Sequence, residues 1–249
     1  MTTSLLNSLL RALLRWGAAL VFCLPLRHRS HFWARACGML FPLLLLAQLL
    51  DPLAQSTTLW QQQLLLLALY ISFFALLGGM IYLCTDINKK GALYCAVWSL
   101  LIAQCAYESW CFLELQFTRY GHPLNMASPW AVLVQLLSGA VFFAAVYLLL
   151  ARQLPYKGEY HIGPRQLFSA FFIGILFMVQ AAVLDNFRAE QFPRSVIATI
   201  LIGQFYFITL LYFQSELFKK SAMEKEMNAL NLLYERQRQQ YQVARQNVQ

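Results

Sequence analysis

Long apolar runs alternate with short polar breaks over the first 213 residues of the chain. Six runs are close to the length of about 20 residues that a helix needs to cross a bilayer core. These spans are expected at His31–Leu50, Leu64–Cys84, Gly91–Phe112, Trp130–Leu150, Leu167–Leu184 and Ser195–Phe213. The breaks between them carry the charges and most of the prolines, as helix ends do. The pattern predicts an all-α polytopic membrane helix bundle over 27–213, with six or seven spans and a kink at Pro42.

The first 26 residues combine leucines at helical spacing with a polar stripe on the other face. Ser4, Ser8, Arg11 and Arg15 form that stripe. Two arginines are costly in the middle of a span, whereas they cost little at a membrane surface. We therefore expect residues 1–26 to form an amphipathic helix on the membrane, and the alternative is a seventh span.

The composition changes sharply after Phe213, because residues 214–249 are rich in Gln, Glu, Lys and Arg and contain no Pro or Gly. Apolar positions recur there at alternating spacings of four and three, with one polar interruption at Gln237. The seam consists of Met223, Met227, Leu230, Tyr234, Tyr241, Ala244 and Val248. This pattern predicts a cytoplasmic coiled coil and a parallel homodimer. The alternative is an amphipathic helix that lies on lipid or on the protein's own loops.

The composition excludes a soluble globular domain, since 59% of the residues are hydrophobic and only 12% are charged. We attribute the net charge of +8 to basic cytoplasmic loops and expect no nucleic-acid partner. Six spans with both termini inside leave only Arg119, Arg188 and Arg194 of the 19 lysines and arginines outside. The positive-inside rule therefore predicts a multi-pass plasma-membrane protein with both termini in the cytoplasm.

Ionisable and amide side chains inside the spans are the candidate chemistry, because such groups are expensive in a membrane. Glu108 is the clearest, with Gln104 one turn earlier on the same helix face. Gln135 and Gln180 also fall toward the outer ends of their spans, and Gln204 lies near the middle of the last one. These residues predict a ligand pocket open to the outside, or else hydrogen bonds that hold the helices together. The sequence offers no catalytic, metal-binding or cofactor-binding residues.

The tail stretch YERQRQQYQVARQNVQ, Tyr234–Gln249, resembles the segment just before the phospho-acceptor helix of GHKL-type sensor histidine kinases. This group includes the accessory-gene-regulator-type peptide-pheromone receptors of Gram-positive bacteria. The layout of spans, linker helix and dimerising helix is also similar. The resemblance implies a bacterial two-component system and a role in quorum sensing, with an extracellular peptide ligand and a cytoplasmic response regulator.

The sequence departs from that family in one respect, because it stops at Gln249 before any histidine on the seam. We therefore expect the chain to be the sensor and signal-transmitting portion of a kinase whose remaining part binds ATP and Mg²⁺. A small-molecule transporter and a membrane scaffold with an oligomerisation helix are the alternatives. The coding sequence beyond Gln249 distinguishes them, since a histidine in a continuing coiled coil favours the receptor.

Overall fold

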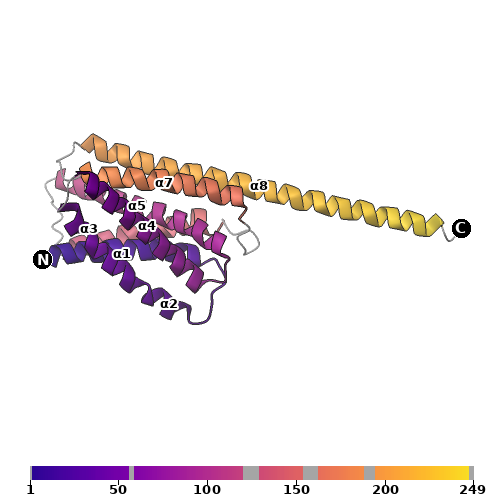
Figure 1. The fold of residues 1–249 in the computed structure, drawn as a ribbon, viewed down its shortest axis with the longest axis horizontal. Coiled ribbons are helices and arrows are strands. Elements are labelled where there is room, and N and C mark those ends of the chain that lie inside the picture. The colour runs from indigo at the N-terminus through magenta and orange to yellow at the C-terminus, as the bar shows by residue number, and fades with distance from the viewer. Residues whose placement is uncertain (1, 56–58, 120–128, 154–161, 188–193, 247–249) are drawn as a thin grey trace. The chain divides into compact units, whose positions relative to one another are not determined.

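The computed structural model of the chain describes residues 2–55, 59–119, 129–153, 162–187 and 194–246. Every regular element in these ranges is a helix (Figure 1), and the β-structure found there is one isolated bridge between His28 and Thr85. The elements are α1 (Thr2–Cys23), α2 (Phe32–Gly38), α3 (Leu40–Gln55), α4 (Leu59–Cys84), α5 (Lys89–Arg119), α6 (Pro129–Val146), the π-helix η1 (Tyr147–Ala151), α7 (Pro164–Phe187) and α8 (Arg194–Gln246). The predicted all-α class is confirmed.

Four helical stretches in the described ranges are long and apolar enough to cross a membrane, which indicates a membrane protein. They are Phe32–Leu49, Leu64–Cys84, Lys89–Glu114 and Trp130–Ala151, and α7 contributes the shorter apolar stretch Pro164–Gln180. These four coincide with the first four spans that the sequence predicts. The total of six or seven spans stays a prediction.

The first of these stretches is broken into α2 and α3 at Gly38–Met39. Proline lacks a backbone N–H, and its ring collides with the carbonyl four residues earlier. Pro42 therefore cannot continue a helix that contains Gly38, and it lies instead in the first turn of α3, where it is tolerated. The structure has an interruption at Met39, three residues before the proline, in place of the predicted kink.

Helix α5 lies at the centre of the bundle. Buried residues make up 72% of its apolar stretch, against 17% for the stretch formed by α6 and η1. The side chains of Tyr94 and Trp98 are completely buried. Helices α1, α4, α6 and α7 all pack against α5. A helix enclosed in this way presents its polar side chains to other helices and not to lipid.

Helix α1 is an integral part of the bundle and packs against α3, α4, α5 and α6. It runs antiparallel to α5, because Phe22 contacts Trp98 near one end and Arg11 contacts Tyr107 near the other. The sequence led us to expect Arg15 at the membrane surface, yet the side chain is only 6% exposed. Helix α1 thus packs within the bundle, and the choice between a surface helix and an extra span stays a prediction.

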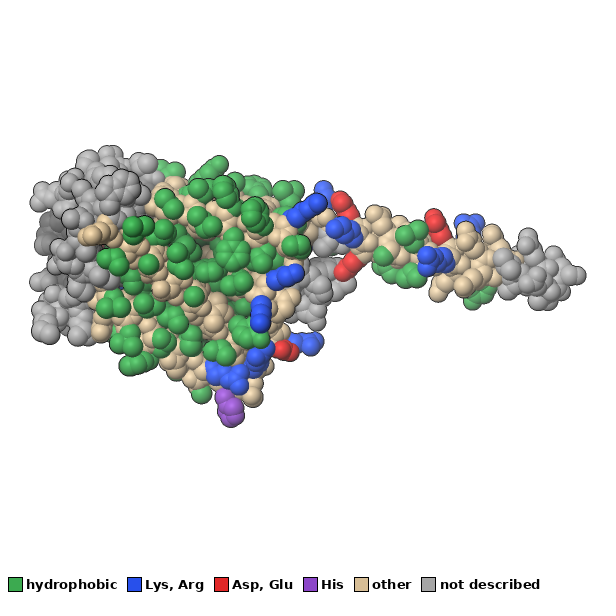
Figure 2. Space-filling model, in the orientation of Figure 1, with side chains coloured by type: hydrophobic (Ala, Val, Ile, Leu, Met, Phe, Trp, Pro, Cys, Tyr) green, Lys and Arg blue, Asp and Glu red, His purple; other side chains and the backbone are tan. Residues whose placement is uncertain are grey.

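Hydrophobic side chains are spread over the face of the bundle that Figure 2 shows, as expected of a surface that faces lipid. Large exposed hydrophobic side chains occur along α3, α4, α6, α7 and α8, among them Leu45, Ile71, Leu137, Phe172 and Ile202. Lysine and arginine side chains gather at one end of the bundle in this view. The chain divides into two compact units, Met1–Leu211 and Tyr212–Gln249, and α8 has residues in both.

Candidate functional site

Two residues of the predicted ligand site form a buried pair on α5. The Gln104 amide donates a hydrogen bond from Nε2 to Oε1 of Glu108 at 3.0 Å. Gln104 is 6% exposed and Glu108 is 2% exposed. The predicted one-turn spacing therefore brings the two groups together on the side of α5 that faces the other helices. A carboxyl group in such a position needs polar neighbours, since burial of a charge is costly.

Helix α1 supplies a guanidinium group to the same region. Arg11 donates a hydrogen bond from Nη2 to the hydroxyl oxygen of Tyr107 at 2.8 Å, and its Cζ lies 4.9 Å from the centre of the Tyr107 ring. Tyr107 precedes Glu108 directly in α5. Arg11 is half-buried. This contact joins residues 96 positions apart and connects the first helix of the chain to its central one.

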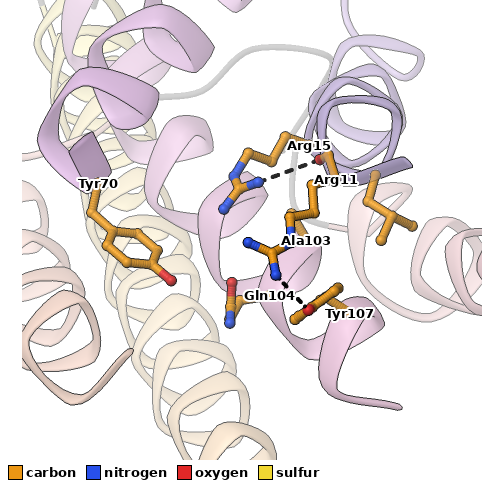
Figure 3. Close-up of a pocket in the computed structure, with 7 residues that line it drawn as sticks. Arg11, Arg15, Tyr70, Ala103, Gln104 and Tyr107 are labelled. Carbon is orange, nitrogen blue, oxygen red and sulfur yellow. Dashed lines mark hydrogen bonds between the residues drawn. The ribbon is translucent and has the colours of Figure 1, made fainter. Parts of the chain in front are cut away.

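Arg15 lies one turn further along α1 and is buried more deeply than Arg11 (Figure 3). Its Nη1 donates to the backbone carbonyl of Arg11 at 3.4 Å, and its Cζ lies 4.0 Å from the centre of the Phe73 ring on α4. A guanidinium over an aromatic face gains about 2 kcal/mol or more when it is desolvated. Phe73 therefore contributes to holding this cation inside the bundle.

A small cavity connects these side chains. It is lined by Arg11, Leu14, Arg15, Tyr70, Ala103, Gln104 and Tyr107. Its volume is about 10 Å³, roughly the minimum for one water molecule. Five of the seven lining residues have polar side chains, and every one of these can donate a hydrogen bond. We call this group of residues, together with Glu108, the polar cluster.

Gln135 of α6 lies at the same height in the bundle as the polar cluster. A side chain on Gly139 would contact Leu14 of α1 at 3.3 Å, and one on Gly17 would contact Phe143 of α6 at 2.9 Å. The two helices therefore run parallel, with Gln135 one turn before Gly139 beside the Arg11 region. Gln135 is 3% exposed, and its Oε1 accepts no hydrogen bond from any described residue.

Gln180, the fourth predicted ligand residue, faces α8. Its Nε2 lies 3.1 Å from the position where a side chain on Gly203 would begin. The neighbouring Gln204 is 1% exposed, and neither its Nε2 nor its Oε1 has a hydrogen-bond partner among the described residues. The same holds for Oε1 of Gln180. The buried Gln204 and the half-buried Gln180 thus both have unused hydrogen-bonding atoms where α7 packs on α8, beside the ring contact between Phe177 and Phe207.

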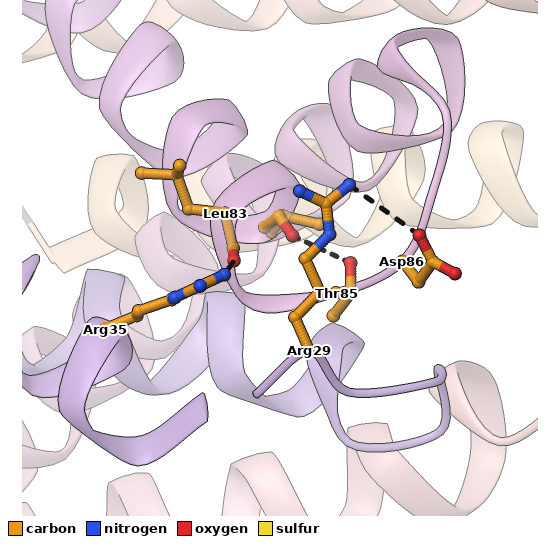
Figure 4. Close-up of polar contacts among 6 residues, drawn as sticks. Arg29, Arg35, Leu83, Thr85 and Asp86 are labelled. Atoms are coloured by element: carbon orange, nitrogen blue, oxygen red, sulfur yellow. Dashed lines mark hydrogen bonds and ion pairs between the residues drawn. The ribbon is translucent and has the colours of Figure 1, made fainter. Parts of the chain in front are cut away.

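A second polar arrangement holds the loops together at the basic end of the bundle (Figure 4). Arg29 forms an ion pair with Asp86 at 3.7 Å, and Arg35 donates from Nη1 to the Leu83 carbonyl oxygen at 2.8 Å. The Leu83 carbonyl belongs to the last turn of α4, where helix carbonyls lack helical partners and attract cations. The segment after α1 is thereby attached to the α4–α5 connection, in a region open to solvent.

The apolar side chains of the predicted seam are exposed in the unit Tyr212–Gln249. The exposed fractions of Met227, Leu230, Tyr234 and Tyr241 are all above 60%. The side chains of Ala244 and Val248 lie outside the described residues, and the seam as a whole stays a prediction. Leu232, which the heptad assignment puts on the opposite face, is exposed as well. Among the described residues of its own unit, no other element covers the apolar surface of this helix.

Sequence reasoning missed Tyr70 and Tyr107, and it assigned Arg11 and Arg15 to the membrane surface. Tyrosines inside apolar runs carry no signal of their own, because they are common in membrane spans. The regular spacing of Ser8, Arg11 and Arg15 was the available signal. In the described residues, no group of three or more His, Cys, Asp or Glu side chains could hold a metal ion.

Comparison with known proteins gave no match, since neither a family model, a curated protein nor a solved structure was significantly similar to this chain.

Proposed function

We propose that this chain is the membrane sensor and signal-transmitting part of a two-component sensor histidine kinase. Its bundle detects an extracellular ligand, and its last helix passes the signal to a dimeric coiled coil in the cytoplasm. The observation that carries the proposal is the 53-residue helix α8, which begins inside the bundle unit and continues through the exposed apolar seam. A continuous helix transmits a rotation or shift, because nothing in it absorbs the movement.

The proposed topology has seven crossings: α1, the α2–α3 pair, α4, α5, α6 with η1, α7 and α8. Helix α1 has 22 residues and is about 33 Å long, enough to cross a bilayer core. Arg29 and Arg35 both lie at the C-terminal end of α4, beside Asp86 and Leu83, and basic residues favour that end of the bundle as the cytoplasmic one. The C-terminus is then cytoplasmic and the N-terminus extracellular. The N-terminus differs from the sequence prediction because α1 packs inside the bundle.

The polar cluster is the proposed sensing site. Gln104 lies about 22 Å along α5 from Lys89, which places it in the outer half of the membrane in the proposed topology. Buried ionisable groups in a membrane are expensive and are retained where they have a function. The contacts of Arg11 with Tyr107, and of Arg15 with Phe73, connect α1, α4 and α5 at this site. A ligand that alters these contacts changes how the helices pack.

Gln180 and Gln204 support a route from the bundle to α8. Oε1 of Gln180 and both side-chain polar atoms of Gln204 are buried without a partner among the described residues where α7 meets α8, and this makes the packing less favourable than an apolar one. A modest rotation of α8 would change the partners available to Gln204. The packing of α7 on α8 can therefore have two arrangements of similar free energy. A ligand that binds one arrangement more tightly then shifts the populations toward it.

The complete kinase would bind ATP and Mg²⁺ in a catalytic part that follows Gln249 and would act on a cytoplasmic response regulator. The coding sequence beyond Gln249 tests this directly. A histidine on a continuing coiled coil, followed by an ATP-binding domain, is the expected result. Membranes containing the complete protein should then transfer phosphate from ATP to that histidine, and replacement of the histidine by glutamine should abolish labelling. A stop codon soon after Gln249 would refute the proposal.

A small-molecule transporter is the second candidate, and the charged residues inside the bundle favour it. Arg15 and Glu108 are both almost completely buried, as residues on a transport path often are. Uptake of labelled organic anions into vesicles that contain the purified chain distinguishes the two functions. Saturable uptake that Arg15→Gln abolishes would favour the transporter.

A further inference from the structure

We propose that the bundle binds the phosphate head group of an anionic phospholipid where the segment after α1 meets the α4–α5 connection. The basic side chains of that region carry the proposal, and we call them the basic patch. They are Arg27, Arg29, Arg35, Lys89 and Lys90. The proposal does not rest on the kinase function, because lipid binding is measured on this chain alone.

Backbone hydrogen bonds bring the two parts of the basic patch together. The Arg29 N–H donates to the Cys84 carbonyl oxygen at 3.0 Å. The Asp86 N–H donates to the Arg27 carbonyl oxygen at 2.9 Å. Helix α5 begins at Lys89, three residues after Asp86. The two arginines therefore lie beside the turn that leads to the two lysines, and the Arg29 side chain points toward Asp86 in that turn (Figure 4).

The positive charge of the basic patch exceeds the negative charge beside it. The carboxylate that the structure describes in this turn is that of Asp86, which pairs with Arg29 at 3.7 Å. Its side chain is 73% exposed, and an ion pair so open to solvent is weak. The side chains of Arg27, Lys89 and Lys90 are exposed and have no partner among the described residues. An anion that reaches this surface therefore finds three cations that need not break an existing contact.

The positions of Lys89 and Lys90 are unfavourable for α5 itself. Both lysines lie in the first turn, which contains no acidic residue. The Gly91 N–H donates to Oδ1 of Asn88 at 2.7 Å, so a neutral amide caps the helix. The helix dipole makes this end positive and disfavours cations there. The stability of α5 thus gives no reason for the two lysines, whereas a bound anion would offset their repulsion.

Exposed apolar side chains beside the basic patch favour a lipid over a soluble anion. Trp33 of α2 is largely exposed, and tryptophan is enriched at the interface between membrane and water. The Leu83 side chain is also exposed, and its carbonyl oxygen accepts the 2.8 Å bond from Arg35. A phospholipid can place its acyl chains against such side chains and its phosphate against the cations. Basic groups at this level attract anionic lipid head groups.

The test uses the purified chain in a non-ionic detergent. Phosphatidylglycerol, phosphatidylcholine or inorganic phosphate is titrated in, and the midpoint of thermal unfolding is recorded. Phosphatidylglycerol should raise the midpoint well above the value in phosphatidylcholine, and inorganic phosphate should have little effect. The difference between the lipids should largely disappear in about 1 M sodium chloride, because the Debye length is then about 3 Å. Equal effects of the two lipids, or an equal effect of inorganic phosphate, would overturn the proposal.

A double variant tests whether the basic patch is the binding site. Arg27→Gln with Lys90→Gln removes two exposed cations that have no partner among the described residues, so the protein should still fold. Each cation contributes about fivefold to the affinity for an anionic lipid surface, so the pair should weaken phosphatidylglycerol binding about 25-fold. Arg152→Gln with Arg165→Gln removes two other exposed cations and is the matched control. A loss of the same size in the control would mean diffuse attraction to the whole protein and would overturn the site.

Asp86→Asn tests the proposal in the opposite direction. The replacement removes the carboxylate beside Arg29 and keeps the backbone N–H that donates to the Arg27 carbonyl oxygen. Phosphatidylglycerol should then bind several-fold more tightly, which a merely destabilising change would not produce. Unchanged or weaker binding in Asp86→Asn would contradict the charge argument. Failure of the complete protein to autophosphorylate would refute the kinase proposal and leave a positive lipid result standing.

Discussion

The Nη2 atom of Arg11 lies 2.8 Å from the hydroxyl oxygen of Tyr107, and this bond joins α1 to α5 inside the bundle. The replacement Tyr107→Phe removes the hydroxyl and keeps the ring under the guanidinium. We expect the bundle to lose about 1 kcal/mol of unfolding free energy, in line with hydrogen bonds measured between membrane helices. Thermal unfolding in detergent measures the loss. Tyr206→Phe, at an exposed tyrosine of α8, is the control and should have no effect.

The packing of α1 also predicts the topology of the N-terminus. A reporter fused before Thr2 should be detected outside the cell, whereas reporters at Lys89 and at the C-terminus should be detected inside. Detection of the N-terminal reporter in the cytoplasm would restore the surface helix for residues 1–26. The contacts within the polar cluster would be unaffected by that result. If the polar cluster still lay in the outer half of the membrane, however, α1 would have to follow a different path from the cytoplasm to reach it.

The sequence was sufficient for helices whose apolar character is continuous. The stretches Leu64–Cys84 and Trp130–Ala151 consist of side chains that can face either lipid or other helices. Each is therefore one uninterrupted apolar run, and the length of that run is enough to predict a span. Helix α1 differs, because Arg11 and Arg15 are compatible either with head groups or with polar partners inside a bundle. The hydrogen-bond partner of Arg11 is Tyr107, which is 96 residues away, and no local sequence pattern predicts that contact. Gln104 and Glu108 were found because both are on one helix, one turn apart.

Gln204 provides a test of the proposal that unused polar groups make the packing of α7 on α8 less favourable. Both of its side-chain polar atoms lack a partner among the described residues, and a buried polar group in that state costs about 1 to 3 kcal/mol. We therefore expect Gln204→Leu to raise the unfolding free energy of the bundle by a similar amount. Gln239→Leu, on the exposed part of α8, should leave the bundle unchanged. A destabilised Gln204→Leu protein would mean that the amide has a partner, such as water.

The exposed seam predicts a parallel dimer with a defined register. Single cysteines in place of Met227, Leu230 or Tyr234 should form disulfides with their counterparts in a second chain. Cysteines in place of Lys225 or Leu232 lie on the other face and should react far less. The measurement is the yield of dimer on a non-reducing gel of oxidised membranes. Similar yields at all five positions would exclude the coiled coil and favour a helix that lies on lipid.

Transmission through α8 is tested by changing the phase of the helix between Phe213 and Met223. Insertion of one residue rotates the seam by about 100° relative to the bundle, whereas insertion of seven residues returns it to within about 20° of its original direction. In the complete protein, the one-residue insertion should alter basal autophosphorylation without affecting ligand binding to the bundle. The seven-residue insertion is the matched control and should keep basal activity close to that of the native protein.

A Gly-Pro pair at the same place interrupts the helix and should abolish the response to ligand. Unchanged ligand-dependent phosphorylation in the Gly-Pro variant would show that the signal does not travel through α8.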